Sequence, residues 1–95
     1  VPEINSQSMK EYMEEYLKPL TEDDGELLRT AKTYVLTGGE LDETANRLYC
    51  HKNTVRYRLT KMQEMMDPHS TEKEFFENLA LAIRIHMLMR YKESE

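Results

Sequence analysis

Apolar side chains in this chain recur at steps of three and four residues, and this periodicity is what most constrains the fold. An α-helix completes a turn every 3.6 residues, so such steps place side chains on one face. Val, Ile and Thr are scattered and form none of the alternating runs that predict strands. The sequence therefore predicts an all-α fold, and its 95 residues suit one small domain over residues 1–95.

Helix breakers and helix caps divide the pattern into about five helices. A first helix is expected over residues 7–18, with Pro19 stopping it. The threonine and three acids of residues 21–24 then look like the cap and first turn of a second helix. Gly38 and Gly39 are expected to end that helix, because glycine accepts the left-handed conformation that closes helices.

Three more helices follow from the same signals. A short third helix is expected to begin with Asp42 as its N-cap, and a fourth runs over about residues 52–66 to an Asp-Pro pair. Thr71 and Glu74 form the pattern of a capping box at the start of a fifth helix over about residues 72–91. The apolar surface of the fifth helix is wider than one stripe. Either this helix lies centrally in the bundle, or one side of it meets another molecule.

The third and fourth helices meet with the spacing of a helix-turn-helix, over about residues 42–66. In that interpretation His51 caps the fourth helix, Cys50 is a small buried side chain in the turn, and Thr54 braces the turn through its hydroxyl. The residues expected to fill the wedge between the two helices are Ala45, Leu48, Val55 and Leu59.

The same region is locally basic, although the whole chain carries a net charge of −5. Residues 44–63 contain five Lys or Arg and no acid, while the other 8 basic and 18 acidic residues give −10. A basic stripe on an acidic body is the electrostatic footprint of phosphate-backbone binding. The residues predicted to contact DNA are Lys52, Asn53, Thr54, Arg56, Tyr57, Arg58, Lys61 and Arg47.

The segment TANRLYCHKNTVRYRLTKM, residues 44–62, resembles the C-terminal helix-turn-helix of PucR/CdaR-type transcriptional regulators. The family signature A-x-x-L-[FY]-x-H-[RK]-N-T-[LVI]-x-Y-R-[LI] is matched through its H-x-N-T-x-x-Y-R core, and the resemblance covers nearly the whole chain. One departure is Ala31-Lys32, where the family more often has Leu. The resemblance implies a DNA-binding output domain of a bacterial regulator, joined to an N-terminal effector-sensing region and located in the cytoplasm.

Several of these side chains have a structural alternative. The guanidinium of Arg58 either contacts DNA or forms an ion pair with an acid on a neighbouring helix. Tyr57 either packs or touches a phosphate. His51 is interpreted as a cap more than as a base reader. Lys52 and Asn53, at the start of the predicted recognition helix over about residues 52–66, are expected to meet base edges.

Other functions find little support in the sequence. Cys50, His51, His69 and His86 lack the spacing of zinc ligands, so we expect no metal. The chain contains no recognisable catalytic set, cofactor motif or apolar run long enough for a membrane span. Because the sequence begins at Val1 rather than Met, we expect it to be the C-terminal part of a longer regulator.

Two function classes therefore remain. In the first, the domain binds double-stranded DNA. In the second, it is a helical interaction module that has kept the scaffold and lost DNA binding. In the first class, DNA binding is expected to require a homodimer, formed through the helix at residues 72–91 or through the N-terminal region that precedes the domain. In the second, the module is expected to pair through the fifth helix.

Overall fold

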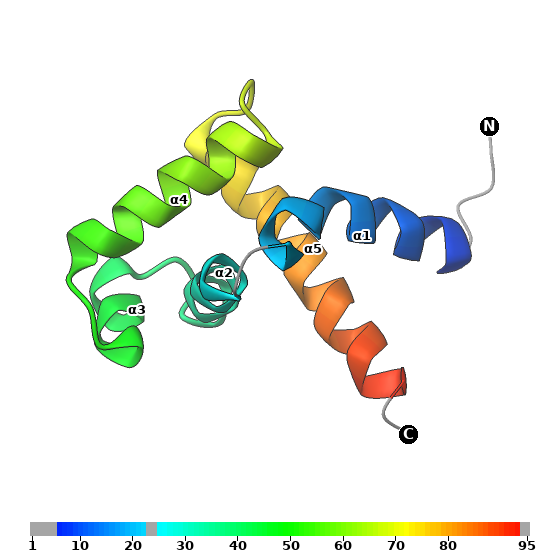
Figure 1. Ribbon diagram of the computed structural model, residues 1–95, viewed down its shortest axis with the longest axis horizontal. Helices are drawn as coiled ribbons and strands as arrows, with labels where there is room; N and C mark the ends of the chain where they lie inside the picture. The colour runs from blue at the N-terminus through cyan, green and yellow to red at the C-terminus, as the bar shows by residue number, and fades with distance from the viewer. Residues whose placement is uncertain (1–5, 23–24, 94–95) are drawn as a thin grey trace.

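The computed structural model describes residues 6–22 and 25–93, and within them the chain is all α-helical, as the sequence predicts (Figure 1). The five helices in these residues are α1 (Ser6–Thr21), α2 (Glu26–Leu36), α3 (Leu41–Leu48), α4 (Lys52–Met66) and α5 (Glu72–Glu93).

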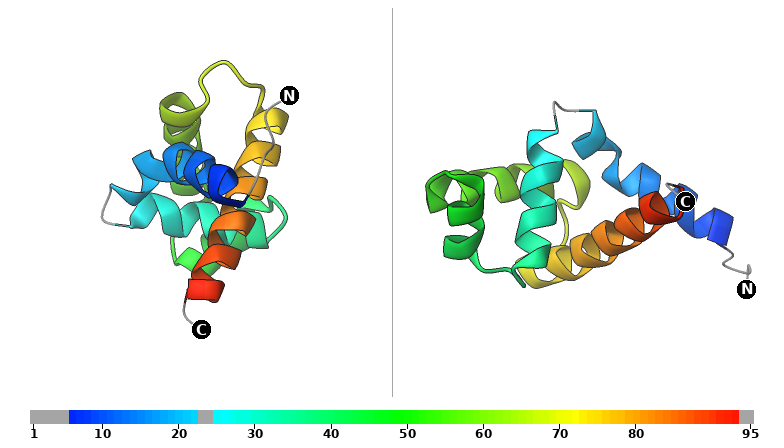
Figure 2. Two further views of the ribbon diagram at one scale, coloured as in Figure 1. Left: turned by 90° about the vertical axis from the view of Figure 1, so that its right-hand side faces the viewer. Right: turned by 90° about the horizontal axis from the view of Figure 1, so that it is seen from below.

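The core forms where α5 passes between α1 and α2, and where the C-terminal half of α4 joins them (Figures 1 and 2). The largest side chains that are less than 2% exposed there include Leu17 and Leu20 of α1, Met62 of α4, and Leu79 and Ile83 of α5. The α3 helix lies at one end of the molecule and contacts only α2 and α4 closely. Consequently α3 and the N-terminal half of α4 project from the bundle as a unit.

The sequence predicted that the first helix stops at Pro19, but the helix continues to Thr21. Proline removes one helical hydrogen bond, yet Leu17 and Leu20 on either side of it are buried, which holds this turn against the core. The Thr21 hydroxyl donates to the Lys18 carbonyl at 3.0 Å, so Thr21 closes α1 rather than capping α2. Glu22 also belongs to the end of α1, because its amide donates to the Lys18 carbonyl at 3.1 Å. The predicted residues at 23 and 24 lie outside the described residues.

The third helix begins at Leu41, so Asp42 lies in its first turn. The prediction that Asp42 is the N-cap was therefore wrong. A pair of threonines fixes the start instead. The Glu40 amide donates to the Thr37 hydroxyl at 3.2 Å, and the Thr44 hydroxyl donates to the Glu40 carbonyl at 2.7 Å. The two hydroxyls are 2.8 Å apart, and Thr44 is fully buried. Local hydrogen bonds of these two threonines therefore set this boundary, and the acid at 42 only complements the helix dipole.

Gly38 and Gly39 end α2 as predicted, and both have a positive φ, 70° and 88°. A Cβ on Gly39 would also lie 3.4 Å from the ring of Phe76, so α5 approaches this turn closely. That ring makes an edge-to-face contact with Tyr34, with centroids 5.5 Å apart. The turn therefore holds α2 against the first part of α5.

The capping box at the start of α5 is present as predicted. The Thr71 amide donates to the Glu74 carboxylate at 3.1 Å, and the Glu74 amide donates to the Thr71 hydroxyl at 3.1 Å. Just before it, the Asp67 carboxylate accepts hydrogen bonds from Tyr16 at 3.4 Å and Asn78 at 3.0 Å. Burial, and then the charge of Asp67, raise the pKa of Tyr16, so that hydroxyl remains a donor. These bonds fix the end of α4 between α1 and α5.

Candidate nucleic-acid interface

The two helices α3 and α4 pack together through the predicted wedge (Figure 1). Ala45 and Val55 are buried, and Leu48 and Leu59 are half-buried beside them. Cys50 is half-buried rather than buried, because the turn that contains it lies at the end of the molecule. The wedge fixes α3 against α4, so the exposed side of α4 has a set direction relative to the bundle.

His51 is the N-cap of α4, as the sequence predicts. Its backbone is extended, with φ −79° and ψ 148°, and its Nδ1 accepts a hydrogen bond from the Asn53 amide at 3.0 Å. The His51 carbonyl accepts the amides of Thr54 and Val55 at 2.9 and 3.4 Å. One otherwise unsatisfied amide at the helix start is thereby paired.

His51→Ala is expected to lower the free energy of unfolding by about 0.5–2 kcal/mol, because it removes this cap. His51→Asn should recover most of the loss, since asparagine is among the best N-cap residues. The measurement is thermal unfolding of the 95-residue chain. His69→Ala is the matched control, because His69 is exposed in the loop after α4. A melting temperature unchanged by His51→Ala would show that the cap does not stabilise α4.

One side of α4 is turned away from the bundle. Val55 and Met62 are fully buried on its inner side. The side chains exposed on the rest of its surface over the first three turns are Lys52, Asn53, Arg56, Tyr57, Thr60 and Lys61. Thr54 is half-buried. Tyr57 is 68% exposed, so of its two alternatives the structure gives no support to packing in the core.

Arg58 points to a different side of α4 and binds α2. Its guanidinium forms an ion pair with Glu26 and donates to the Thr30 hydroxyl at 3.3 Å. The Arg58 side chain is only 20% exposed. Of the alternatives open for Arg58, the ion pair with an acid on a neighbouring helix is therefore the one present. Arg47 is exposed but is also paired, with Glu43 one turn earlier on α3 at 2.7 Å.

The remaining bases of the region are Lys52, Arg56 and Lys61, and the structure records no ion pair for them with any residue in 6–22 or 25–93. Arg56 instead donates a hydrogen bond to the Asn53 side-chain carbonyl at 3.1 Å. This bond orients the amide of Asn53, whose nitrogen is left to donate elsewhere. The exposed positive charge of the helix-turn-helix is therefore concentrated on α4.

Acidic side chains mark the limits of this basic surface. Glu64 is exposed and lies eleven residues after Asn53, which returns it to the same side of α4. A phosphate chain alongside α4 would be repelled from this point onward, so the first three turns are the usable part.

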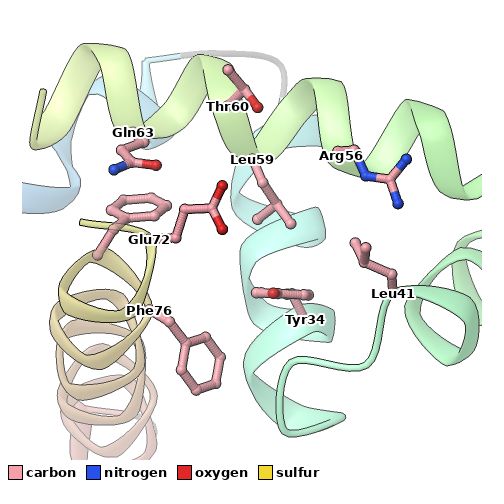
Figure 3. A pocket seen from close by; sticks show the side chains of 9 residues that line it. Tyr34, Leu41, Arg56, Leu59, Thr60, Gln63, Glu72 and Phe76 are labelled. Atoms are coloured by element: carbon pink, nitrogen blue, oxygen red, sulfur yellow. The ribbon is translucent and has the colours of Figure 1, made fainter. Parts of the chain in front are cut away.

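A hollow of about 170 Å³ lies on the flank of α4, between it, α2 and α5 (Figure 3). Figure 3 shows the Glu72 carboxylate directed into this hollow, whereas Arg56 extends away from it, towards Leu41. The residues lining it are Tyr34, Leu41, Arg56, Leu59, Thr60, Gln63, Glu72, Phe75 and Phe76. Burial, then Glu72 and Glu40, raise the pKa of Tyr34, so its hydroxyl stays neutral. The acid on this flank borders the basic surface on the side of α5.

Two exposed residues near the basic surface were not among the predicted contacts. Thr60 lies one turn after Tyr57, and the 100° step per residue could have placed it on the outer side. Tyr49, in the turn between α3 and α4, is 92% exposed, and no sequence signal predicted that exposure.

Residues 6–22 and 25–93 contain neither a candidate metal cluster nor a membrane-spanning helix. Within these ranges no group of three or more His, Cys, Asp or Glu side chains is placed to hold a metal ion. None of the helices described there is both long enough and apolar enough to cross a membrane.

A short helix, a tight turn and a longer helix with an exposed basic start define a helix-turn-helix domain of the DNA-binding type. The chain belongs to the PucR C-terminal helix-turn-helix domain family, whose sequence profile matches residues 27–85. The predicted resemblance is confirmed. The family consists of domains of transcription regulators and is not a family of enzymes.

Among its relatives, the chain is 36% identical to the purine catabolism regulatory protein of Bacillus subtilis (strain 168) over 86 residues, which are 87% of this chain and 16% of that protein. It is 38% identical over 55 residues to an uncharacterized protein of Haemophilus influenzae, covering 54% of this chain and 15% of that protein. An uncharacterized protein of Mycobacterium tuberculosis (strain H37Rv) is 32% identical to this chain over 56 residues, which are 59% of this chain and 14% of that protein. The chain thus spans only about 14–16% of the length of these relatives. No solved structure matches it significantly.

Proposed function

We propose that this domain binds double-stranded DNA sequence-specifically, with the N-terminal half of α4 in the major groove. The observation that supports this most is the exposed surface of α4, where Lys52, Arg56 and Lys61 carry positive charge beside Asn53. A helix-turn-helix inserts its second helix with the N-terminal residues at the base edges.

The roles of the side chains follow from their positions along α4. Lys52 and Asn53, in the first turn, would meet base edges, and Arg56 would reach a guanine or a phosphate from the next turn. Tyr57 is exposed on the same side and would contact the backbone. Lys61 lies eight residues after Asn53, about 12 Å along the helix, so a phosphate at the border of the groove is its partner.

We reassign Arg58 from DNA contact to the positioning of α4. Its ion pair and hydrogen bond to α2 are only partly open to solvent, and they set the rotation of α4 about its axis. Arg47 remains a phosphate contact in the proposal, because it is exposed and can exchange Glu43 for a phosphate. Thr54, half-buried at the helix start, would contact DNA through its hydroxyl alone.

The experiment that tests this proposal is titration of the chain with duplex DNA at several salt concentrations. Each neutralised phosphate releases counterions, so the logarithm of the affinity should fall steeply with the logarithm of the salt concentration. An interaction module that has lost DNA binding would show no such slope. The longer protein would act as a transcription regulator in the bacterial cytoplasm, where the DNA is located.

We also propose that two copies pair through α5, whose outer side is exposed. Leu81 and Leu88 are 55% and 57% exposed and lie seven residues apart on one stripe, with Tyr91 beside them. An antiparallel pair can set Leu81 opposite Leu88 of the second copy. Glu77 then lies opposite Lys92 of that copy, because the two residue pairs have the same midpoint along the helix. Opposite charges therefore flank the contact, and the exposed Arg84 of each copy lies near its midpoint, between the two leucines of the stripe.

Changing both leucines to glutamate is expected to abolish pairing and to weaken binding to a two-site operator, while binding to a single half-site is kept. Sedimentation velocity measures the first effect, and duplexes with one and two half-sites measure the second. Leu36→Glu is the control, since Leu36 is 61% exposed on α2. A parent chain that remains monomeric at high concentration would contradict pairing through α5. The N-terminal region of the longer protein would then be the pairing element to test.

A further inference from the structure

The two helices α2 and α3 end with the same backbone motif. In each, the amide of the residue in the left-handed conformation donates a hydrogen bond to the carbonyl three residues earlier. The amide of the following residue donates to the carbonyl five residues before it. This is a Schellman motif. The four bonds run from Gly38 to Val35 (3.0 Å), Gly39 to Tyr34 (2.9 Å), Tyr49 to Asn46 (3.3 Å) and Cys50 to Ala45 (3.0 Å).

The residue in the left-handed position differs between the two motifs. At the end of α2 it is Gly38, with φ 70°. At the end of α3 it is Tyr49, with φ 55° and ψ 43°, the only non-glycine residue of positive φ in the described ranges. A Cβ clashes with the following carbonyl in this conformation, so glycine is the favoured residue there and tyrosine is not. Tyrosine at position 49 therefore costs the fold stability that glycine would not.

Packing does not explain the tyrosine either. Its side chain is 92% exposed, more than any other large apolar or aromatic residue in the described ranges. The structure records no hydrogen bond or ring contact for that side chain within those ranges. A non-glycine residue held at a strained position without local benefit indicates a contact outside the chain.

The position of Tyr49 identifies that contact. It lies two residues before the cap His51 and three before Lys52, so its Cα is at most about 11 Å from that of Lys52. No acid lies between residues 44 and 63 to repel a phosphate. The turn of a helix-turn-helix lies beside the start of the recognition helix, where the DNA backbone borders the groove. A phenol there is a hydrogen-bond donor of suitable length for a phosphate oxygen.

We propose that Tyr49 is a DNA-contacting residue, whose phenolic hydroxyl donates a hydrogen bond to a backbone phosphate beside the start of α4. This inference rests on the proposed DNA-binding function. The contact is neutral and touches no base. It therefore adds affinity without adding to the salt dependence or to the base preference.

Two variants separate the cost to the fold from the gain in binding. Tyr49→Gly relieves the strain and removes the side chain, so its melting temperature should rise by about 5 °C or more. Tyr49→Phe keeps the ring and the strain but lacks the hydroxyl, so it should melt like the parent. Both should bind the DNA about ten-fold more weakly, with unchanged salt slope and base preference. The probe is a duplex selected by the parent chain from a randomised pool.

Tyr12→Phe is the matched control, because Tyr12 is also exposed but lies on α1, and its binding should equal that of the parent. Tyr49→Phe binding as tightly as the parent would overturn the hydroxyl contact. A Tyr49→Gly chain no more stable than the parent would overturn the premise that tyrosine is costly at this position. If the parent itself shows no salt-dependent binding, the proposed function fails first, and that result differs from either of these.

Discussion

Replacing Lys52, Arg56 and Lys61 together by glutamine is expected to remove most of the salt dependence of DNA binding. These three bases are exposed on α4, and the structure records no ion pair for them within residues 6–22 and 25–93. Each Lys or Arg whose charge neutralises a phosphate contributes a log–log slope of about 0.9, so three cations in the groove and at its border contribute up to roughly 2.7 per domain. That share corresponds to about 40-fold in affinity between 50 and 200 mM salt, and the variant should keep only the smaller slope of the remaining bases, such as Arg47.

A matched control carries the same change of net charge elsewhere on the surface. Lys18, Lys73 and Arg90 are exposed and lie on α1 and α5, away from the outer side of α4 and from the stripe of Leu81 and Leu88. Their replacement by glutamine should leave the slope near that of the parent, because only long-range attraction is weakened. If both triple variants flatten the slope equally, the binding responds to net charge alone, and the assignment of the contacts to α4 is wrong.

The contributions of the other two bases can be separated in the same titration. Arg58→Gln should lower stability by breaking its contacts with α2, yet change the slope little, because its charge is already neutralised by Glu26. Arg47 is paired as well, but on an exposed helix surface where such pairs contribute only about 0.3–0.5 kcal/mol. That pair can therefore open towards a phosphate at small cost.

Most of the fold was predictable from the sequence because apolar periodicity reports directly on helical faces. The capping signals that depend only on near neighbours were also correct, at His51 and at Thr71 with Glu74. Two boundaries were predicted wrongly, for different reasons. Leu20 remains helical after Pro19 because distant core residues bury it, whereas the start of α3 is set by local hydrogen bonds of Thr37 and Thr44 to Glu40 that take precedence over the capping preference of Asp42.

The candidate site was also predictable in part: local spacing placed its side chains, but long-range partners could not be predicted. The 100° step between residues correctly places Asn53 and Arg56 on the outer side of α4, opposite Val55. It cannot show that Arg58 has a partner 32 residues earlier in the chain. That ion pair, together with the one between Arg47 and Glu43, leaves three of the five bases without a recorded partner in residues 6–22 and 25–93. The step also cannot show that Tyr49 is exposed in a left-handed conformation, because the backbone conformation of a turn depends on how the two helices pack.

The other large effect is expected in which DNA the domain prefers. Asn53→Ala should cost about 1–3 kcal/mol at one base pair of the site and relax the preference there, because it removes a base-reading amide. In the free chain Arg56 donates to the Asn53 carbonyl at 3.1 Å, so the amide nitrogen is already oriented outward. A side chain positioned before binding loses less conformational freedom on contact with a base edge, and a larger share of the interaction appears as specificity.

Lys61→Gln is the informative counterpart, because the two residues lie about 12 Å apart along one helix, close to the width of the major groove. If Asn53 lies at the base edges, Lys61 lies at the bordering backbone. Its loss should weaken all sequences alike and lower the salt slope by about one unit, with preferences unchanged. The measurement is selection from a randomised duplex pool at two salt concentrations. Unaltered preferences for Asn53→Ala, together with altered preferences for Lys61→Gln, would mean that α4 enters the groove from its other end. The exposed Glu64 near that end opposes such a geometry, since it would bring a carboxylate against the phosphates.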